Sequence, residues 1–205
     1  MLGFVAMKIH RFRSKSPALL ERRAAILDLI ALSELTLSDQ EIEAYLTGPN
    51  DVLLAEEDGR LLALCVGTHR STEALRFLGF LLVVVHPSAR RRGLLGRLTT
   101  RYVIGELPRI ALRTLTSPRR PYVAFADVCN PVSYRRLAFA PRVLPDLLRG
   151  NTTAELAEAR QLRGRLAAAL GLDDLDVETG LMGHSAGKQL SRRDAGPDRP
   201  PSQFA

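Results

Sequence analysis

Two strongly apolar segments of the chain, residues 75–85 and 122–128, are separated by a helical pattern that begins at Gly93. An apolar strand, a helix and a second apolar strand in this order form a crossover connection within one sheet. Nearly every residue of 122–128 is apolar, which is typical of a central strand buried on both faces. These segments predict a sheet with helices packed on it, in the α/β (α+β) class.

Shorter strand-like segments precede the first of these strands. Residues 52–55 and 61–68 have the pattern of two strands, and Glu57-Asp58-Gly59 between them is a strong hairpin signal. Residues 8–12 alternate as a weaker first strand. We therefore expect a central mixed, mostly antiparallel twisted sheet flanked by helices.

Local signals mark the helices of the first half. Ser16-Pro17 combines a capping serine with a proline in the first turn, which predicts a helix over 17–32. Ser38 and Glu41 have the spacing of a capping box before a second, shorter helix. In the helix after Gly93, Pro108 is expected either to break the helix or to begin a second short one.

The C-terminal third is more varied in composition. Asn130-Pro131 begins a helix, an alanine-rich helix covers 154–170, and a last strand is expected at 175–182. Beyond Ser185 the chain is almost without apolar residues, which is typical of disorder. We expect one domain over residues 1–185, with a helical insertion or extension at about 151–171, and a disordered tail over residues 186–205.

Composition excludes several classes of protein. Hydrophobic residues are 46% of the 205, enough for a sizeable core. No apolar run reaches the roughly 18 residues of a membrane helix. The cysteines, Cys65 and Cys129, are far apart and have no CxxC spacing, so neither a disulfide framework nor a zinc site is indicated. We expect a cytoplasmic protein without a metal.

The net charge of +7 is concentrated in one region. Between residues 86 and 120, nine arginines stand against the single acid Glu106. Three of these arginines lie between the apolar strand and Gly93, where the next helix begins. Because the first N–H groups of a helix have no partner within it and its dipole favours negative charge, this turn predicts a phosphate site. The alternative is a solvated arginine run, although cations at a helix N-terminus are unfavourable without an anion.

Val85-x-Pro87-x-x-Arg90-x-x-Gly93-Leu94, followed by Leu98, resembles the acetyl-coenzyme A motif of the GNAT-type N-acetyltransferases. In that family a strand, a pyrophosphate loop and a helix follow in this order. The family pattern Arg-x-x-Gly-x-Gly/Ala differs at its last position, where Leu95 stands and Gly96 follows. The resemblance implies that acetyl-CoA is the acyl donor. The residues it places at this cofactor are Val83, Val84, Val85, Arg90, Arg91, Arg92, Gly93, Leu94, Leu95 and Gly96.

A second segment also resembles the family, in which Asn-x-x-Ala-x-x-x-Tyr follows the next strand. There the asparagine holds the pantetheine arm and the tyrosine lies near the thiol as an acid. Asn130 and Ser133 take the first two places here, and Leu137 replaces the tyrosine. Tyr134 shares a helical face with Asn130, so its phenol could approach the same end of the cofactor, with a packing role as the alternative. Asn130-Pro131 with Tyr134 is similar to a bacterial subgroup that carries Asn-Pro-x-x-Tyr.

The resemblance implies direct transfer of an acetyl group from acetyl-CoA to a primary amine in a ternary complex. Tyr134 is the candidate acid. Asp127 is the first candidate base, because an acid in an apolar strand should point into the cleft, and a solvated strand end is the alternative. Glu73 and Glu43 are weaker candidates. In the family the strand carries a bulge whose free N–H faces the thioester, and residues 83–85 are where it is expected.

The partner implied is a small-molecule or peptide amine, and a homodimer is compatible with the sequence. We expect no membrane binding and no nucleic-acid binding. Two other functions are weighed against the enzyme: a CoA-binding domain without turnover, and an arginine-rich nucleic-acid-binding module. The absence of Trp and the 5% aromatic content disfavour the module.

Overall fold

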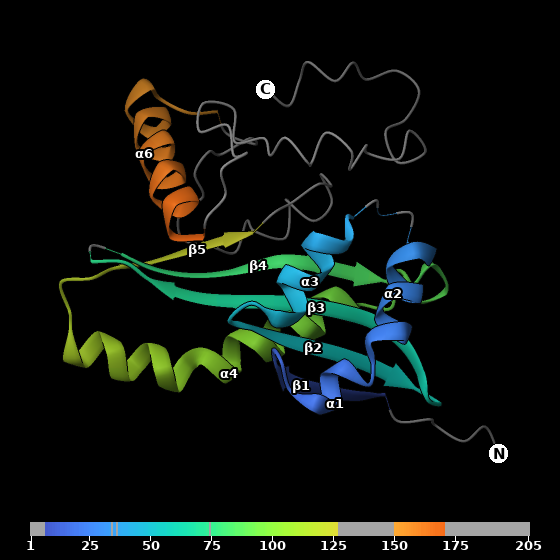
Figure 1. Ribbon diagram of the computed structural model, residues 1–205. Coiled ribbons are helices and arrows are strands. Elements are labelled where there is room, and N and C mark those ends of the chain that lie inside the picture. The colour runs from blue at the N-terminus through green and yellow to red at the C-terminus, as the bar shows by residue number, and fades with distance from the viewer. Residues whose placement is uncertain (1–6, 34, 36, 74, 127–149, 171–205) are drawn as a thin grey trace, which may run out of the picture. The chain divides into compact units, whose positions relative to one another are not determined.

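The computed structural model describes residues 7–33, 35, 37–73, 75–126 and 150–170. The chain divides into two compact units, Met1–Asp127 and Val128–Ala205. The first unit contains a five-stranded sheet in the order β1-β2-β3-β4-β5 (Figure 1). Its strands are β1 Lys8–Arg13, β2 Asn50–Glu57, β3 Arg60–Ser71, β4 Arg76–Val85 and β5 Tyr122–Ala126.

The pairs β1–β2, β2–β3 and β3–β4 are antiparallel, and β5 is parallel to β4. The predicted mixed, mostly antiparallel sheet with flanking helices is therefore confirmed, as is the crossover between β4 and β5. Within the described chain β5 pairs only with β4, which differs from the central position expected for it. Its apolar character has a local reason, because the Phe125 ring packs directly on Gly79 of β4.

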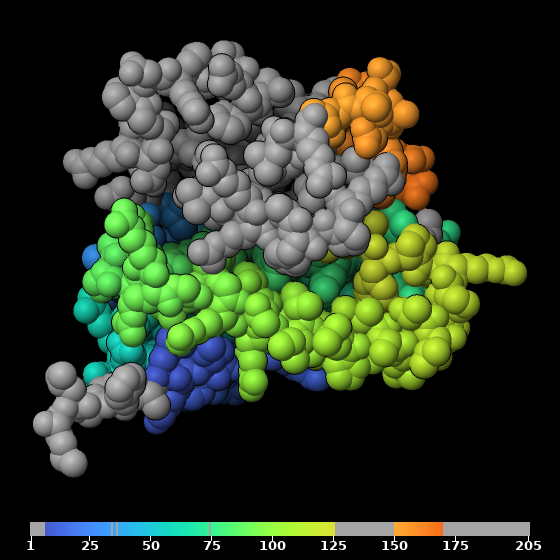
Figure 2. All heavy atoms as spheres, turned by 180° about the vertical axis from the view of Figure 1, so that it is seen from behind, coloured from blue at the N-terminus to red at the C-terminus, as the bar shows by residue number. Residues whose placement is uncertain are grey.

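Helices cover both faces of the sheet. The helices of the first unit are α1 Pro17–Leu20, α2 Arg23–Leu32, α3 Asp39–Thr47 and α4 Leu94–Thr116. Side chains of α1, α2 and α3 form one core with one face of β2, β3 and β4, and α4 forms a second core with the other face. Figure 2 shows α4, coloured green to yellow-green, crossing its face of the first unit beside the blue N-terminal strand.

The predicted helix over 17–32 is two helices, because the chain tightens between Glu21 and Arg22. The Arg22 N–H bonds to the Leu19 carbonyl, three residues back, and the Arg22 side chain pairs with Glu56 of β2. The capping box is confirmed: Ser38 N–H donates to Glu41 at 2.7 Å, and Glu41 N–H donates to the Ser38 hydroxyl at 3.2 Å.

Helix α4 continues through Pro108, so both expectations for this proline were wrong. A proline inside a helix removes the hydrogen bond to the carbonyl four residues back, here that of Ile104. Ile104 and Pro108 both lie on the exposed side of α4, where water can satisfy that carbonyl. The helix beyond Pro108 is held to the sheet on its other side by Arg113, whose guanidinium donates to Ser71 at 3.0 Å.

A one-residue bulge divides β4. Leu82 pairs with Val66 and Phe80 pairs with Gly67, so Leu81 is the extra residue. An extra residue reverses the alternation of faces along a strand. Even-numbered residues before the bulge and odd-numbered residues after it consequently face α4.

In the second unit, α6 spans Thr153–Leu170 and agrees with the helix predicted over 154–170. Thr152 caps it: Thr152 N–H donates to Glu155 at 2.8 Å, and Glu155 N–H donates to the Thr152 hydroxyl at 3.2 Å. The last predicted strand and the predicted tail lie outside the described residues. The single domain over 1–185 stays a prediction.

Candidate functional site

The turn between β4 and α4 contains two residues with left-handed backbone. After the 3₁₀ turn η1, Pro87–Ala89, Arg91 has a φ of 66° and Gly93, the N-cap of α4, has a φ of 74°. Glycine adopts this conformation at little cost, whereas a residue with a Cβ such as Arg91 does so only when its surroundings hold it there.

Main-chain N–H groups of this turn have no acceptor among the described residues. No side chain caps α4, and the first N–H of the helix to be bonded is that of Arg97, which donates to the Gly93 carbonyl at 3.1 Å. The unbonded groups are the N–H of Arg91, Gly93, Leu94, Leu95 and Gly96. Five donors at the positive end of a 23-residue helix form an anion site.

The core holds this turn from beneath. Ala89, Leu94 and Leu98 are buried against the α4 face of the sheet. His86 ties the turn to β3: its N–H donates to the Leu62 carbonyl at 2.8 Å, and its Nδ1 accepts from the Ser88 N–H at 3.1 Å. The free N–H groups are thus carried on a fixed support, as a preorganised binding site requires.

The three arginines of the turn differ in their contacts. Arg92 is bound to Glu57 of β2 by two hydrogen bonds of 2.9 and 2.6 Å. The hydrogen bonds from Arg92 hold the pKa of the Glu57 carboxyl below its usual value. Arg90 and Arg91 are exposed and make no side-chain hydrogen bond or ion pair to the described chain. Two guanidinium groups are therefore available to a ligand at this turn.

Space for a ligand lies beside the free N–H groups. A Cβ placed on Gly93 would have no atom within 4 Å. A groove of about 610 Å³ begins at Gly93 and Gly96 and follows α4 to Ile104, with Met7 and Ile9 on its other side. Its size is within the range of ligand pockets in proteins.

The bulge in β4 lies at Leu81, so its expected position within residues 83–85 was wrong. Val83, Val84 and Val85 pair in unbroken register with Cys65, Leu64 and Ala63. The bulge instead follows Phe80, which is the last residue of β4 that pairs with a described residue of β5. The position of a bulge depends on the register of two strands, which the sequence of one strand does not reveal.

The other predicted site residues lie outside the described residues. These are Asp127, Asn130, Ser133 and Tyr134. Of the weaker candidates for the base, Glu43 is exposed on α3. Glu73 lies before the start of β4, whereas the anion-binding turn lies after the end of this strand. Burial raises the pKa of the Cys65 thiol to about 12, which makes it an unreactive core residue.

A second group of charged residues lies on the α4 face of the sheet. Glu106, 1% exposed, accepts hydrogen bonds from His69 Nδ1 at 2.9 Å, from Arg109 at 3.1 Å and from Arg11. Arg11 also donates to Asp51 at 2.8 Å. The sequence marks Glu106 as the single acid among nine arginines, but not the strands that surround it.

His69 is neutral in this group. Burial lowers its pKa, and the charges of Arg113 and Arg109 add to this effect against the opposing hydrogen bond to Glu106. Its Nδ1–H donates to Glu106, and its Nε2 faces Arg113 at 3.4 Å.

Within the described ranges, no cluster of three or more His, Cys, Asp or Glu residues has the arrangement of a metal site. No helix in the same part of the chain is long and apolar enough to cross a membrane.

No protein-family model matches the chain, and no curated protein sequence matches it. Solved structures with similar folds include a ribosomal-protein-alanine N-acetyltransferase from Brucella melitensis biovar Abortus 2308 (19% identity, 69% of this chain and 94% of that chain, TM-score 0.44). Another is a predicted acetyltransferase with acetyl-CoA from Clostridium acetobutylicum (16% identity, covering 72% of this chain and 100% of that chain, TM-score 0.45). A third is an aminoglycoside N-acetyltransferase in complex with CoA (16% identity, 67% and 88%, TM-score 0.43).

Proposed function

We propose that this chain is an acetyl-CoA-dependent N-acyltransferase that transfers an acetyl group to a primary amine in a ternary complex. The observation that carries the proposal is the uncapped start of α4, where five main-chain N–H groups lack acceptors in the described chain beside the exposed Arg90 and Arg91. This is the turn on which the sequence carries the motif Val85-x-Pro87-x-x-Arg90-x-x-Gly93.

The residues of the turn fit the diphosphate of coenzyme A. Main-chain N–H groups supply hydrogen bonds that need no side-chain ordering, and each guanidinium adds charge-assisted bonds worth about 1.5–3 kcal/mol. The groove that begins at Gly93 and Gly96 offers room for the nucleoside. When bound, acetyl-CoA supplies an acyl thioester that an amine can attack.

The remaining steps are assigned to residues of the chain. Asp127 accepts the proton that the acceptor ammonium must lose, and Tyr134 donates a proton to the leaving sulfur. Asn130 and Ser133 hold the pantetheine arm. The acceptor is a small-molecule or peptide amine. A screen of amines for release of free thiol from acetyl-CoA would identify it.

Acetyl-CoA is expected to raise the melting temperature of the full chain. A ligand that binds only the folded state at a hundredfold excess over its Kd adds about 2.7 kcal/mol to the free energy of unfolding. Arg90→Glu should abolish this shift, because it puts a negative charge at the diphosphate. Arg119→Glu makes the same change of charge in the turn after α4 and should keep the shift. Thermal unfolding with and without acetyl-CoA measures both.

The outcomes separate the alternatives. No shift with the wild-type chain would overturn the proposal. A shift without release of free thiol across a panel of amines would identify a CoA-binding domain without turnover. Binding of a DNA duplex that weakens steeply with salt would identify a nucleic-acid-binding module instead.

Gly93→Ala tests the main-chain donors themselves, with Gly59→Ala as its matched control. Both glycines have nearly the same φ, 74° and 73°, and a Cβ on either would have no atom within 4 Å. Each substitution should therefore cost a similar 1–2 kcal/mol of stability, roughly that of forcing alanine into the left-handed region. Only the methyl group on Gly93 lies beside the free N–H groups, so only this variant should lose the melting shift with acetyl-CoA. Equal shifts in the two variants would contradict a diphosphate at this turn.

A further inference from the structure

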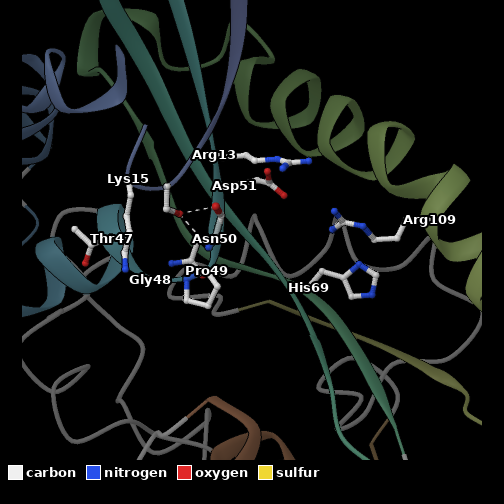
Figure 3. Close-up of a pocket in the computed structure, with 10 residues that line it drawn as sticks. Arg13, Lys15, Thr47, Gly48, Pro49, Asn50, Asp51, His69 and Arg109 are labelled. Carbon is white, nitrogen blue, oxygen red and sulfur yellow. Dashed lines mark hydrogen bonds between the residues drawn. The ribbon is translucent and has the colours of Figure 1, made fainter. Parts of the chain in front are cut away.

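A second pocket, of about 490 Å³, lies at the end of the sheet where β2 begins, between the C-terminal end of α3 on one side and His69 and Arg109 on the other (Figure 3). Its lining includes Arg13, Lys15, Asn50, Asp51, His69 and Arg109. His69 of β3 pairs with Leu78 of β4, seven residues before the strand ends at Val85. At about 3.3 Å per residue this is roughly 23 Å along the strand. The pocket is therefore distinct from the turn at the start of α4.

The carboxylates in and beneath this pocket are already paired. Asp51 accepts a hydrogen bond from Arg11 at 2.8 Å. Glu106 accepts bonds from Arg11, Arg109 and His69. Arg11 and Arg109 thus neutralise the two acids, and the neutral His69 adds no charge to the lining.

Two further cations have no such partner. Arg13 stands directly opposite Asp51 in the pairing of β1 with β2, yet Asp51 bonds to Arg11. Neither Arg13 nor Lys15 makes a side-chain hydrogen bond or ion pair to the residues that the structure describes. Figure 3 shows the guanidinium groups of Arg13 and Arg109 pointing toward one another across the pocket. Because Arg11 and Arg109 already balance Asp51 and Glu106, the unpaired Arg13 and Lys15 leave an excess of two positive charges in a concave site, which attracts anions.

Hydrogen bonds fix the rim of the pocket before any ligand arrives. Lys15 has a left-handed backbone, with a φ of 64°, and its N–H donates to the Leu46 carbonyl at 3.1 Å. The Asn50 amide donates to the carbonyls of Ala44 and Tyr45 at 3.2 and 3.1 Å. Asn50 N–H donates to the Ser14 hydroxyl at 3.0 Å. These bonds hold the side of the pocket formed by residues 14–15 and the start of β2 against the end of α3.

We propose that this pocket binds a small oxyanion, a phosphate or carboxylate group, between the guanidinium groups of Arg13 and Arg109, with the Lys15 ammonium adding positive charge on the opposite side of the pocket, beside Thr47 (Figure 3). Guanidinium groups match such oxygens with pairs of N–H donors, and a lysine ammonium adds a point charge. The buried Glu106 holds Arg109 at the edge of the site. This site does not depend on the proposed acyltransferase function.

The test is calorimetric titration of inorganic phosphate, and separately of citrate, at constant ionic strength. The background is full-length Arg90→Glu, in which the turn before α4 is disabled, so that binding there does not contribute. Arg13→Gln/Lys15→Gln removes two exposed cations of the pocket and should weaken binding at least tenfold. Arg119→Gln/Arg120→Gln removes two exposed cations in the turn after α4 and should leave the Kd within twofold.

Loss of binding in the pocket variant alone, for either phosphate or citrate, supports the proposal, and the anion that binds identifies the group. If neither anion binds the background protein, the proposal is wrong. It is also wrong if both double variants weaken binding equally, because the effect would then come from net charge. Melting curves of the double variants check that they are folded.

Discussion

Glu106→Gln is expected to lower the free energy of unfolding by about 3–5 kcal/mol, the usual cost of removing one partner from a buried ionic group. The Glu106 carboxylate accepts from Arg11, Arg109 and His69, and its side chain is 2% exposed. A neutral amide leaves Arg11 and Arg109 without this compensating charge. Urea unfolding measures the loss.

Glu43→Gln is the control for this substitution. Glu43 is exposed on α3, and its side chain makes no hydrogen bond or ion pair to the described chain. Its removal should change stability by less than about 0.5 kcal/mol. If the two variants lost similar stability, the Glu106 group would not be a structural centre.

The same variant should change the pH dependence of stability. Burial alone would raise the pKa of Glu106, but hydrogen bonds from His69 and Arg11 and the charge of Arg109 outweigh it, and the pKa lies below 4.5. A carboxyl with a lowered folded pKa stabilises the fold above its unfolded pKa and loses this contribution as the pH falls through the folded pKa. His69, with a pKa below 6.5, resists a proton that the unfolded chain accepts, so stability also falls below about pH 6.5. As the pH falls below about 4.5, the free energy of unfolding should therefore decrease less in Glu106→Gln than in the wild-type chain.

Tyr102→Ala is expected to destabilise the first unit by about 3–5 kcal/mol, because it empties a large site in the core under α4. Tyr102 is fully buried, with Phe80 edge-on to its ring at 5.4 Å between centroids and the Arg11 guanidinium 5.5 Å from its centroid. The ring lies on Gly67, where an added Cβ would be 2.4 Å from the Tyr102 Cζ.

This contact predicts a strong non-additivity. In the wild-type chain Gly67→Ala should cost about 1–3 kcal/mol, because the ring is enclosed and cannot move away. In the Tyr102→Ala background the same substitution should cost almost nothing, because its methyl group enters vacated space. Chemical denaturation of the two single variants and the double variant gives the coupling energy. Additive losses would mean that the ring relaxes freely.

Features with a local cause could be predicted from the sequence. The hairpin turn has φ values of 53° at Asp58 and 73° at Gly59, the conformation that an Asp-Gly turn favours. The capping box at Ser38 and the glycine before α4 likewise depend on a few neighbouring residues.

Features that depend on pairing between distant segments could not be predicted. Leu62 is an extra residue in β3, as Leu81 is in β4, and neither leaves a mark on the alternation of one apolar strand. The contact of Arg11 with Glu106 joins residues 95 apart, so the arginine count around Glu106 indicated charge but not burial. The hydrogen bonds from Arg92 to Glu57 form because the β2–β3 turn lies beside the start of α4 in the folded chain.

The bulge at Leu81 has a consequence for how this chain tolerates insertion and deletion. If Leu81 were deleted and the pairing of residues 82–85 with β3 were kept, the side chains of residues 76–80 would move to the opposite face of the sheet. Arg76, 4% exposed, now donates to the carbonyls of Ser117 and Arg120 and would face the helices of the opposite layer instead. The number of residues in β4 is therefore constrained more tightly than the identity of residue 81. Homologues should carry different apolar residues at position 81, without insertions or deletions in this strand.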